Sequence, residues 1–126
     1  MSFKTLMIIK AVVCLGFGPL LLFFPDPLLT LLGSAYCAGA ALTAREYGAA
    51  LIGTMLLTWF GRNIQEFIAR RAINLALFVY DGVALVAMLS VQIAGILNPL
   101  GWGVVVVYLF FTVGFGYLFL TEKAAP

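Results

Sequence analysis

Four long apolar runs, separated by short polar or glycine- and proline-containing segments, make up most of this chain. Each run is long enough to cross the hydrocarbon core of a bilayer as an α-helix, which takes roughly 20 residues. The pattern therefore predicts an all-α fold, an integral membrane four-helix bundle that forms a single domain over residues 1–126. The predicted spans are residues 5–24, 40–60, 72–93 and 102–120.

A short extra element is predicted between the first two spans. Pro25-Asp26-Pro27 ends the first run, and Asp26 is expected to cap a new helical turn that has Pro27 at its first position. The apolar residues 28–32 that follow are too few to span a membrane and stop at Gly33. We expect this turn to lie at the membrane surface.

Composition supports a membrane location and narrows the possible functions. Hydrophobic residues make up 64% of the chain and charged residues 10%, whereas soluble domains have about 45–50% and about 25%. The net charge of +2 gives no reason to expect nucleic-acid binding. The chain has no histidine, the commonest metal ligand and general base, and Cys14 and Cys37 form no CxxC pair. We therefore expect no enzymatic activity, no cofactor and no bound metal.

Basic residues predict the orientation. With four spans, the N-terminus, the polar linker 62–71 and the C-terminus lie on one side, and Arg45 is the only basic residue on the other. The positive-inside rule then places both termini in the cytoplasm. The basic residues on the predicted cytoplasmic side are Lys4, Lys10, Arg62, Arg70, Arg71 and Lys123.

Asp81 is the first candidate for a functional residue. It follows Arg71 by about ten residues, which places it near the middle of the membrane, where a charge costs at least about 2.5–3.5 kcal/mol. Such a carboxylate either handles a proton, a cation or a ligand, or fixes helix packing as a neutral or ion-paired group. Asn74 lies on the same helical face and is the second candidate, whereas Tyr80 lies on a different face.

Two further charged positions interrupt the apolar runs. Arg45 and Glu46 stand near the outer end of the second span, and adjacent helical residues point about 100° apart. They either contact an anionic headgroup or substrate from the outer side, or form structural ion pairs, for Arg45 with Glu46 or Asp81. Lys10 is expected to extend back to the cytoplasmic interface, and the alternative is a salt bridge to Asp81.

Small residues at a spacing of four indicate close helix contacts. Cys14 and Gly18 in the first span, and Ala49 and Gly53 in the second, follow the small-xxx-small pattern. We favour packing within the bundle over a dimer face for both pairs.

Three segments carry a resemblance to known proteins: AREYGAALIGTMLLTWFGRN (residues 44–63), ARRAINLALFVYDG (69–82) and GILNPLGWG (95–103). They resemble small four-span bacterial membrane proteins of unknown function, which are loosely similar to DoxX-like families. The resemblance implies a four-helix bundle in a bacterial inner membrane and assigns no reaction or catalytic residue.

These observations favour a non-enzymatic protein that works by binding within the membrane. It is expected to be an accessory or assembly subunit of a larger membrane complex, or to hold a lipid-like ligand within the bundle. The alternative is an oligomeric small transporter or channel component, in which Asp81 and the Arg45-Glu46 pair line a polar path.

Overall fold

The computed structural model describes residues 1–35 and 37–123, and all regular structure in that part of the chain is helical, as expected. Helices α1 (Phe3–Phe23), α4 (Phe67–Ile93) and α5 (Gly101–Thr121) are long and apolar enough to cross a membrane. Helix α2 (Pro25–Leu31) is short. Helix α3 (Ala38–Gly61) is also long, but it is less apolar than these three helices, because it contains charged residues and many small residues.

Helix α4 differs most from its predicted bounds, because it begins at Phe67 rather than at 72. The carboxylate of Glu66 accepts hydrogen bonds from the backbone N–H groups of Ile68 at 2.9 Å and Ala69 at 2.7 Å. A side-chain cap of this kind starts a helix even where the following residues are polar. Half of the expected polar linker is therefore the first turn of α4.

The predicted short turn is helix α2, but its predicted cap is wrong. The helix begins at Pro25 rather than at Pro27. Phe24 is both the C-cap residue of α1 and the N-cap residue of α2. Asp26 consequently lies inside the first turn, where its charge still favours the positive end of the helix dipole. After α2 the chain turns at Gly33, whose φ of +80° is a conformation that glycine adopts readily.

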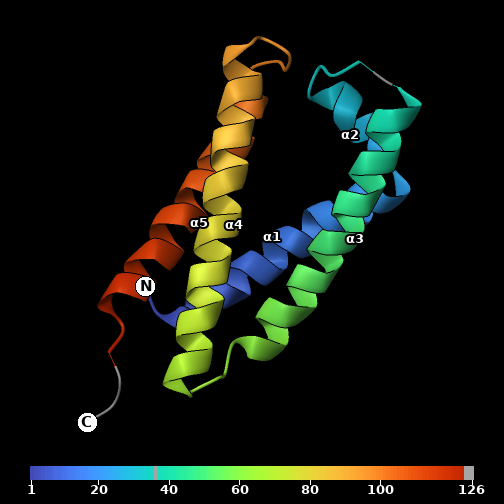
Figure 1. Ribbon diagram of the computed structural model, residues 1–126. Coiled ribbons are helices and arrows are strands. Elements are labelled where there is room, and N and C mark those ends of the chain that lie inside the picture. Colours follow the sequence, from blue (N-terminus) through green and yellow to red (C-terminus); the bar gives the residue numbers. More distant parts are fainter. Residues whose placement is uncertain (36, 124–126) are drawn as a thin grey trace.

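The helices form two hairpins, one of α1, α2 and α3 and the other of α4 and α5 (Figure 1). Among the described residues, no Cα atom of α3 lies within 8 Å of a Cα atom of α4 or α5. Figure 1 shows the hairpins diverging from the α3–α4 linker, near the N-terminus, toward the end that carries α2 and the α4–α5 loop. Side chains, rather than backbone proximity, must therefore connect α3 to the second hairpin.

Glycines bring α1 and α3 into backbone contact. A Cβ atom on Gly48 would lie 2.6 Å from the carbonyl oxygen of Gly18 and 2.6 Å from the backbone nitrogen of Leu22. Only a residue without a side chain fits there. Cys14 and Gly18 are buried in this contact, so the predicted close packing of that face is confirmed.

The other small-xxx-small pair does not take part in this packing. Ala49 and Gly53 are exposed, and a Cβ atom on Gly53 would have no neighbour within 4 Å. The prediction of packing within the bundle is wrong for this pair. The reason is that Gly48, one residue earlier, faces α1, and the next residue on a helix points about 100° away.

A buried apolar cluster joins α1 to the second hairpin near the N-terminus. Leu6 packs against Gly114, where an added Cβ atom would approach the leucine side chain to 2.9 Å. The buried residues of this cluster are Phe3, Leu6, Met7, Leu77, Phe111, Phe115 and Leu118.

Asn98 connects the hairpins at the opposite end. Its backbone N–H donates to the carbonyl of Leu32 at 2.9 Å, and its side-chain Nδ2 donates to the carbonyl of Leu31 at 2.7 Å. The α4–α5 loop is thus attached to the end of α2. The two hairpins are joined at both ends, which leaves the region between the ends open to side-chain contacts.

Substituting Gly48 tests the backbone contact between α1 and α3. Gly48→Ala is expected to lower the free energy of unfolding by about 1–3 kcal/mol, because the added methyl group overlaps backbone atoms that cannot move independently. Gly53→Ala is the matched control, since it lies on the same helix in open space and gains helix propensity. Unfolding of both variants in mixed detergent micelles, followed by circular dichroism, measures the difference. Equal stability of the two variants would contradict the contact.

Candidate functional site

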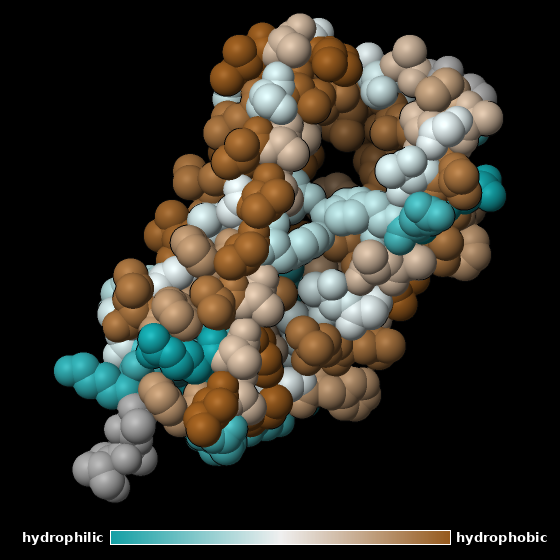
Figure 2. Space-filling model, viewed as in Figure 1, coloured by the Kyte–Doolittle hydropathy of each residue, from teal (hydrophilic) through white to brown (hydrophobic). Residues whose placement is uncertain are grey.

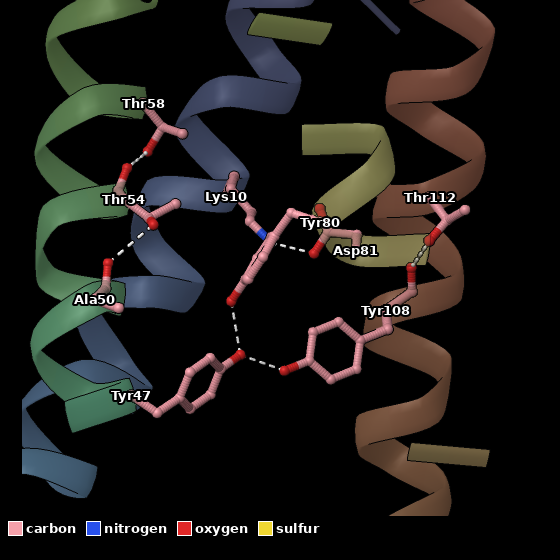
Figure 3. Close-up of polar contacts among 9 residues, drawn as sticks. All are labelled: Lys10, Tyr47, Ala50, Thr54, Thr58, Tyr80, Asp81, Tyr108 and Thr112. Atoms are coloured by element: carbon pink, nitrogen blue, oxygen red, sulfur yellow. Dashed lines mark hydrogen bonds and ion pairs between the residues drawn. The ribbon is translucent and has the colours of Figure 1, made fainter. Parts of the chain in front are cut away.

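Polar side chains from four helices meet between the two hairpins (Figure 3). Lys10 comes from α1, Tyr47 from α3, Tyr80 and Asp81 from α4, and Tyr108 from α5. We call these five residues the interhairpin polar cluster. It is the main polar contact across a boundary where the backbones of α3 and α4 stay apart.

Lys10 and Asp81 form a buried ion pair at the centre of this cluster. The Lys10 ammonium donates a hydrogen bond to Asp81 Oδ1, and the two side chains are 3% and 0% exposed. The ammonium also lies 4.8 Å from the ring centroid of Tyr80 and 4.4 Å from that of Phe111, within the range of cation–π attraction. Carboxylate and aromatic faces together replace the water that the ammonium loses.

The ion pair overturns the expectation that Lys10 extends to the interface. That expectation assumed upright helices, on which Lys10 and Asp81 lie at different depths. Figure 1 shows α1 running obliquely across α4, and the crossing brings the two side chains together. The alternative salt bridge is the one that forms.

The ion pair retains unused hydrogen-bonding capacity. Asp81 Oδ2 is buried without a hydrogen-bond partner among the described residues. The Lys10 ammonium has three hydrogens, and one of them is directed at Asp81 Oδ1. A buried acceptor without a partner typically destabilises the folded protein by about 1–3 kcal/mol, and a hydrogen-bond donor beside Asp81 Oδ2 would remove this cost.

Three tyrosine hydroxyls form a chain beside the ion pair. The hydroxyl of Tyr47 lies 2.7 Å from that of Tyr80 and is also hydrogen-bonded to that of Tyr108 (Figure 3). Three hydroxyl groups carry three hydrogens, and the two bonds between them use two. One hydrogen is left to donate to a further acceptor.

Figure 2 shows a hollow between the diverging halves of the two hairpins, with apolar residues around it and a band of pale, more polar residues running beneath it from α4 to α3. We call this the interhairpin hollow. It lies between α4 and α3, the helices that carry Tyr80 and Tyr47.

A groove of about 370 Å³ lies between α3 and α4. Tyr80 ends this groove and so borders it as well as the hydroxyl chain. The other lining residues are Thr54, Leu57, Ala72, Ile73, Ala76 and Leu77. Tyr80 thus joins the polar cluster to a largely apolar groove.

The structure separates Arg45 and Glu46 from this cluster. Both side chains are exposed on α3, and neither forms an ion pair with another described residue. The predicted structural pairing of Arg45 with Glu46 or Asp81 is therefore wrong, because Asp81 is already paired with Lys10 from the neighbouring helix.

Asn74 shares the buried face of Asp81 but belongs to a different set of contacts. It lies about 10 Å from Asp81 along α4, and its Nδ2 donates to Glu122 at 2.9 Å. Glu122 is ion-paired with Arg70, whose guanidinium stacks 4.5 Å from the ring centroid of Phe3. This group holds the start of α4 and the end of α5 to the start of α1.

Tyr47 and Tyr108 are the members of the cluster that the sequence did not single out. Both lie well inside long helices, where a hydroxyl needs a hydrogen-bond partner. That requirement is the signal available in the sequence. It does not reveal the partner, because Tyr47 and Tyr108 are 61 residues apart.

Comparison with known proteins assigns the chain to no family: no protein-family model, no curated protein and no solved structure matches it. Among the described residues, no group of three or more Cys, Asp or Glu side chains is placed to hold a metal ion. The polar cluster and the groove beside it are therefore the features that bear on function.

The buried ion pair is open to a double-mutant test. Lys10→Met and Asp81→Asn are each expected to lower the free energy of unfolding by about 3–5 kcal/mol, because each leaves the other partner buried and uncompensated. The double variant should lose clearly less than the sum of the two. Unfolding of all four proteins by denaturing detergent measures the coupling energy. Strict additivity would show that the two side chains do not interact.

Proposed function

We propose that this protein is an integral membrane protein that crosses the bilayer four times and binds a lipid-like molecule between its two hairpins. One observation carries the proposal: a largely apolar groove between α3 and α4 ends at Tyr80, whose hydroxyl belongs to a tyrosine chain with one unused hydrogen. Pockets that are mostly apolar, with a few convergent polar groups, are typical small-molecule sites.

The distribution of apolar side chains supports the membrane location. Only 17% of the most apolar 18-residue stretch of α4 is buried within the protein. Large hydrophobic side chains such as Val83, Val86 and Ile93 are exposed. Contiguous apolar surface on this scale needs a non-aqueous environment or a partner. Lipid tails provide that environment along the whole length of a helix.

Packing supports the inclusion of α3 among the spans. Its 24 residues extend about 36 Å, enough to cross a hydrocarbon core of about 30 Å. It also packs along α1, one of the three most apolar helices, through the contact between Gly18 and Gly48. A helix held beside a spanning helix in this way crosses the same layer.

Charge supports the proposed orientation, with both termini in the cytoplasm of a bacterial inner membrane, in keeping with the resemblance to DoxX-like proteins. The start of α1, the α3–α4 linker and the end of α5 are at one end of the bundle (Figure 1). That end carries the basic residues Lys4, Arg62, Arg70, Arg71 and Lys123, whereas the opposite end carries Arg45.

A second candidate function is that of an accessory subunit that contacts a partner through α3. The exposed Arg45 and Glu46 have no ion-pair partner among the described residues, and a charged residue within a span is usually paired. The same positions weigh against the transport alternative, because they do not line a path with Asp81.

Thiol labelling tests the topology. Cys37 is exposed between α2 and α3 and should react with a membrane-impermeant maleimide in spheroplasts, whereas Cys14 is buried. In a Cys37→Ser background, a cysteine at position 63 in the α3–α4 linker should react only after the membrane is permeabilised. Reaction of position 63 in intact spheroplasts would reverse the proposed orientation.

Native mass spectrometry from mild detergent tests ligand binding. The protein is expected to retain a molecule of lipid mass, and Tyr47→Phe or Tyr108→Phe should reduce its occupancy about fivefold by removing a hydrogen-bonding hydroxyl. Tyr117→Phe is the matched control, because Tyr117 lies on the same helix as Tyr108 but is 60% exposed. Retention that is equal in all variants would contradict binding at the tyrosine chain. A co-purified protein partner would favour the accessory-subunit function.

A further inference from the structure

We propose that one face of α3 is a dimerisation surface, and that its partner is a second copy of this chain in the same orientation. This inference rests on the proposed membrane location and goes beyond lipid binding, which does not require it. The second candidate function uses the same face of α3, and this inference assigns that face to a second copy instead. Three observations support it: an exposed seam along α3, two small residues at its middle, and two unpaired opposite charges.

The exposed seam runs along α3 outside the contact between Gly48 and α1. Its members recur at alternating steps of four and three residues, the spacing at which two parallel helices pack side by side. The residues of this α3 seam are Leu42, Glu46, Ala49, Gly53, Leu56 and Phe60. All six are exposed, including Leu42 at 61% and Phe60 at 74%. The other described helices therefore leave the α3 seam without a partner.

Ala49 and Gly53 allow a second helix to approach the middle of the α3 seam closely. A Cβ atom on Gly53 would have no neighbour within 4 Å, so the space beside the α3 backbone is open at this point. Small residues four apart are typical of contacts between spanning helices, because association within lipid depends on close packing. Helix α1 packs on Gly48 and does not use this pair. The pair is therefore free to contact a helix of another copy.

Arg45 and Glu46 make this face of α3 complementary to itself. Both are exposed about 10 Å from the start of α3, and neither forms an ion pair with another described residue. Charged residues within a span are costly and usually paired. In a dimer whose two-fold axis runs along the membrane normal, the α3 helices are parallel and the same patch of each copy meets. Glu46, a seam residue, then packs into the hole that includes Arg45 of the second copy.

Charge balance favours a second copy over a different protein as the occupant of this face. The symmetry of the dimer repeats the pairing of Glu46 with Arg45, so two reciprocal ion pairs form and no charge is left over. A different protein would need its own adjacent pair of opposite charges at the same depth. The chain itself supplies that arrangement.

Charge reversal tests the reciprocal pairing. Cys37, exposed between α2 and α3, is labelled with a donor or an acceptor dye, and energy transfer is followed as the full-length protein is diluted in dioleoylphosphatidylcholine vesicles. Arg45→Glu should weaken the dimer at least about tenfold, because it gathers four carboxylates at the interface. Arg45→Glu combined with Glu46→Arg is self-complementary again, and its dissociation constant should return to within about threefold of the original.

Cross-linking tests the α3 seam itself. In a Cys37→Ser background, Gly53→Cys should form a disulfide-linked dimer under mild oxidation, because small seam residues bring the two backbones within reach of a disulfide. Val83→Cys is the matched control, since Val83 is 65% exposed near the middle of another spanning helix. Gly53→Leu should abolish energy transfer, whereas Gly53→Ala keeps a small residue and should not.

Each outcome decides which partner occupies this face of α3. Energy transfer that is absent at every lipid ratio, or that Arg45→Glu does not change, would overturn the dimer and leave the lipid-binding proposal intact. Equal cross-linking of the Gly53 and Val83 variants would reflect random collision and would also overturn it. Cross-links from Gly53→Cys to a different protein in native membranes, with no linked pair of copies, would assign the face to an accessory-subunit contact. Circular dichroism of each variant establishes that it is folded.

Discussion

The buried pair of Lys10 and Asp81 is the interaction on which the arrangement of the two hairpins depends. Each hairpin is held internally by apolar and glycine contacts, such as that of Gly48 against α1. Among the described residues, no Cα atom of α1 lies within 8 Å of one in α4, so a long side chain must connect these two helices. A charge in an apolar environment has few favourable positions other than beside its counter-charge. The pair therefore fixes where α1 crosses α4.

The tyrosine chain beside this pair connects α3 to the second hairpin. Among the described residues, no Cα atom of α3 lies within 8 Å of one in α4 or α5, so only long side chains reach across this space. The tyrosine chain occupies part of this space, and its hydroxyls satisfy one another except for one hydrogen. Polar groups placed for structural reasons in this way also form a surface that a ligand can recognise. Structure and proposed function thus share the same five residues.

The sequence predicted the elements better than their contacts. The apolar runs and their boundaries indicated the long helices, and the short helix after Pro25 followed from its length and flanking residues. Cap positions were harder, because Glu66 extends α4 into a polar stretch and Phe24 replaces Asp26 as the cap of α2. A cap depends on the geometry of a single side chain, which hydrophobic periodicity does not contain.

By itself, the sequence determined that the chain is helical and apolar, and that Asp81 and Lys10 are charges that need an explanation inside apolar helices. These conclusions follow from the composition and the hydrophobic pattern of each segment, which do not depend on the rest of the chain. Only the tertiary structure decided that the two charges pair, that Gly48 rather than Ala49 and Gly53 faces α1, and that Tyr47 and Tyr108 meet. The physical reason is the crossing of the helices, since their tilt and rotation are set by the packing of all neighbours together.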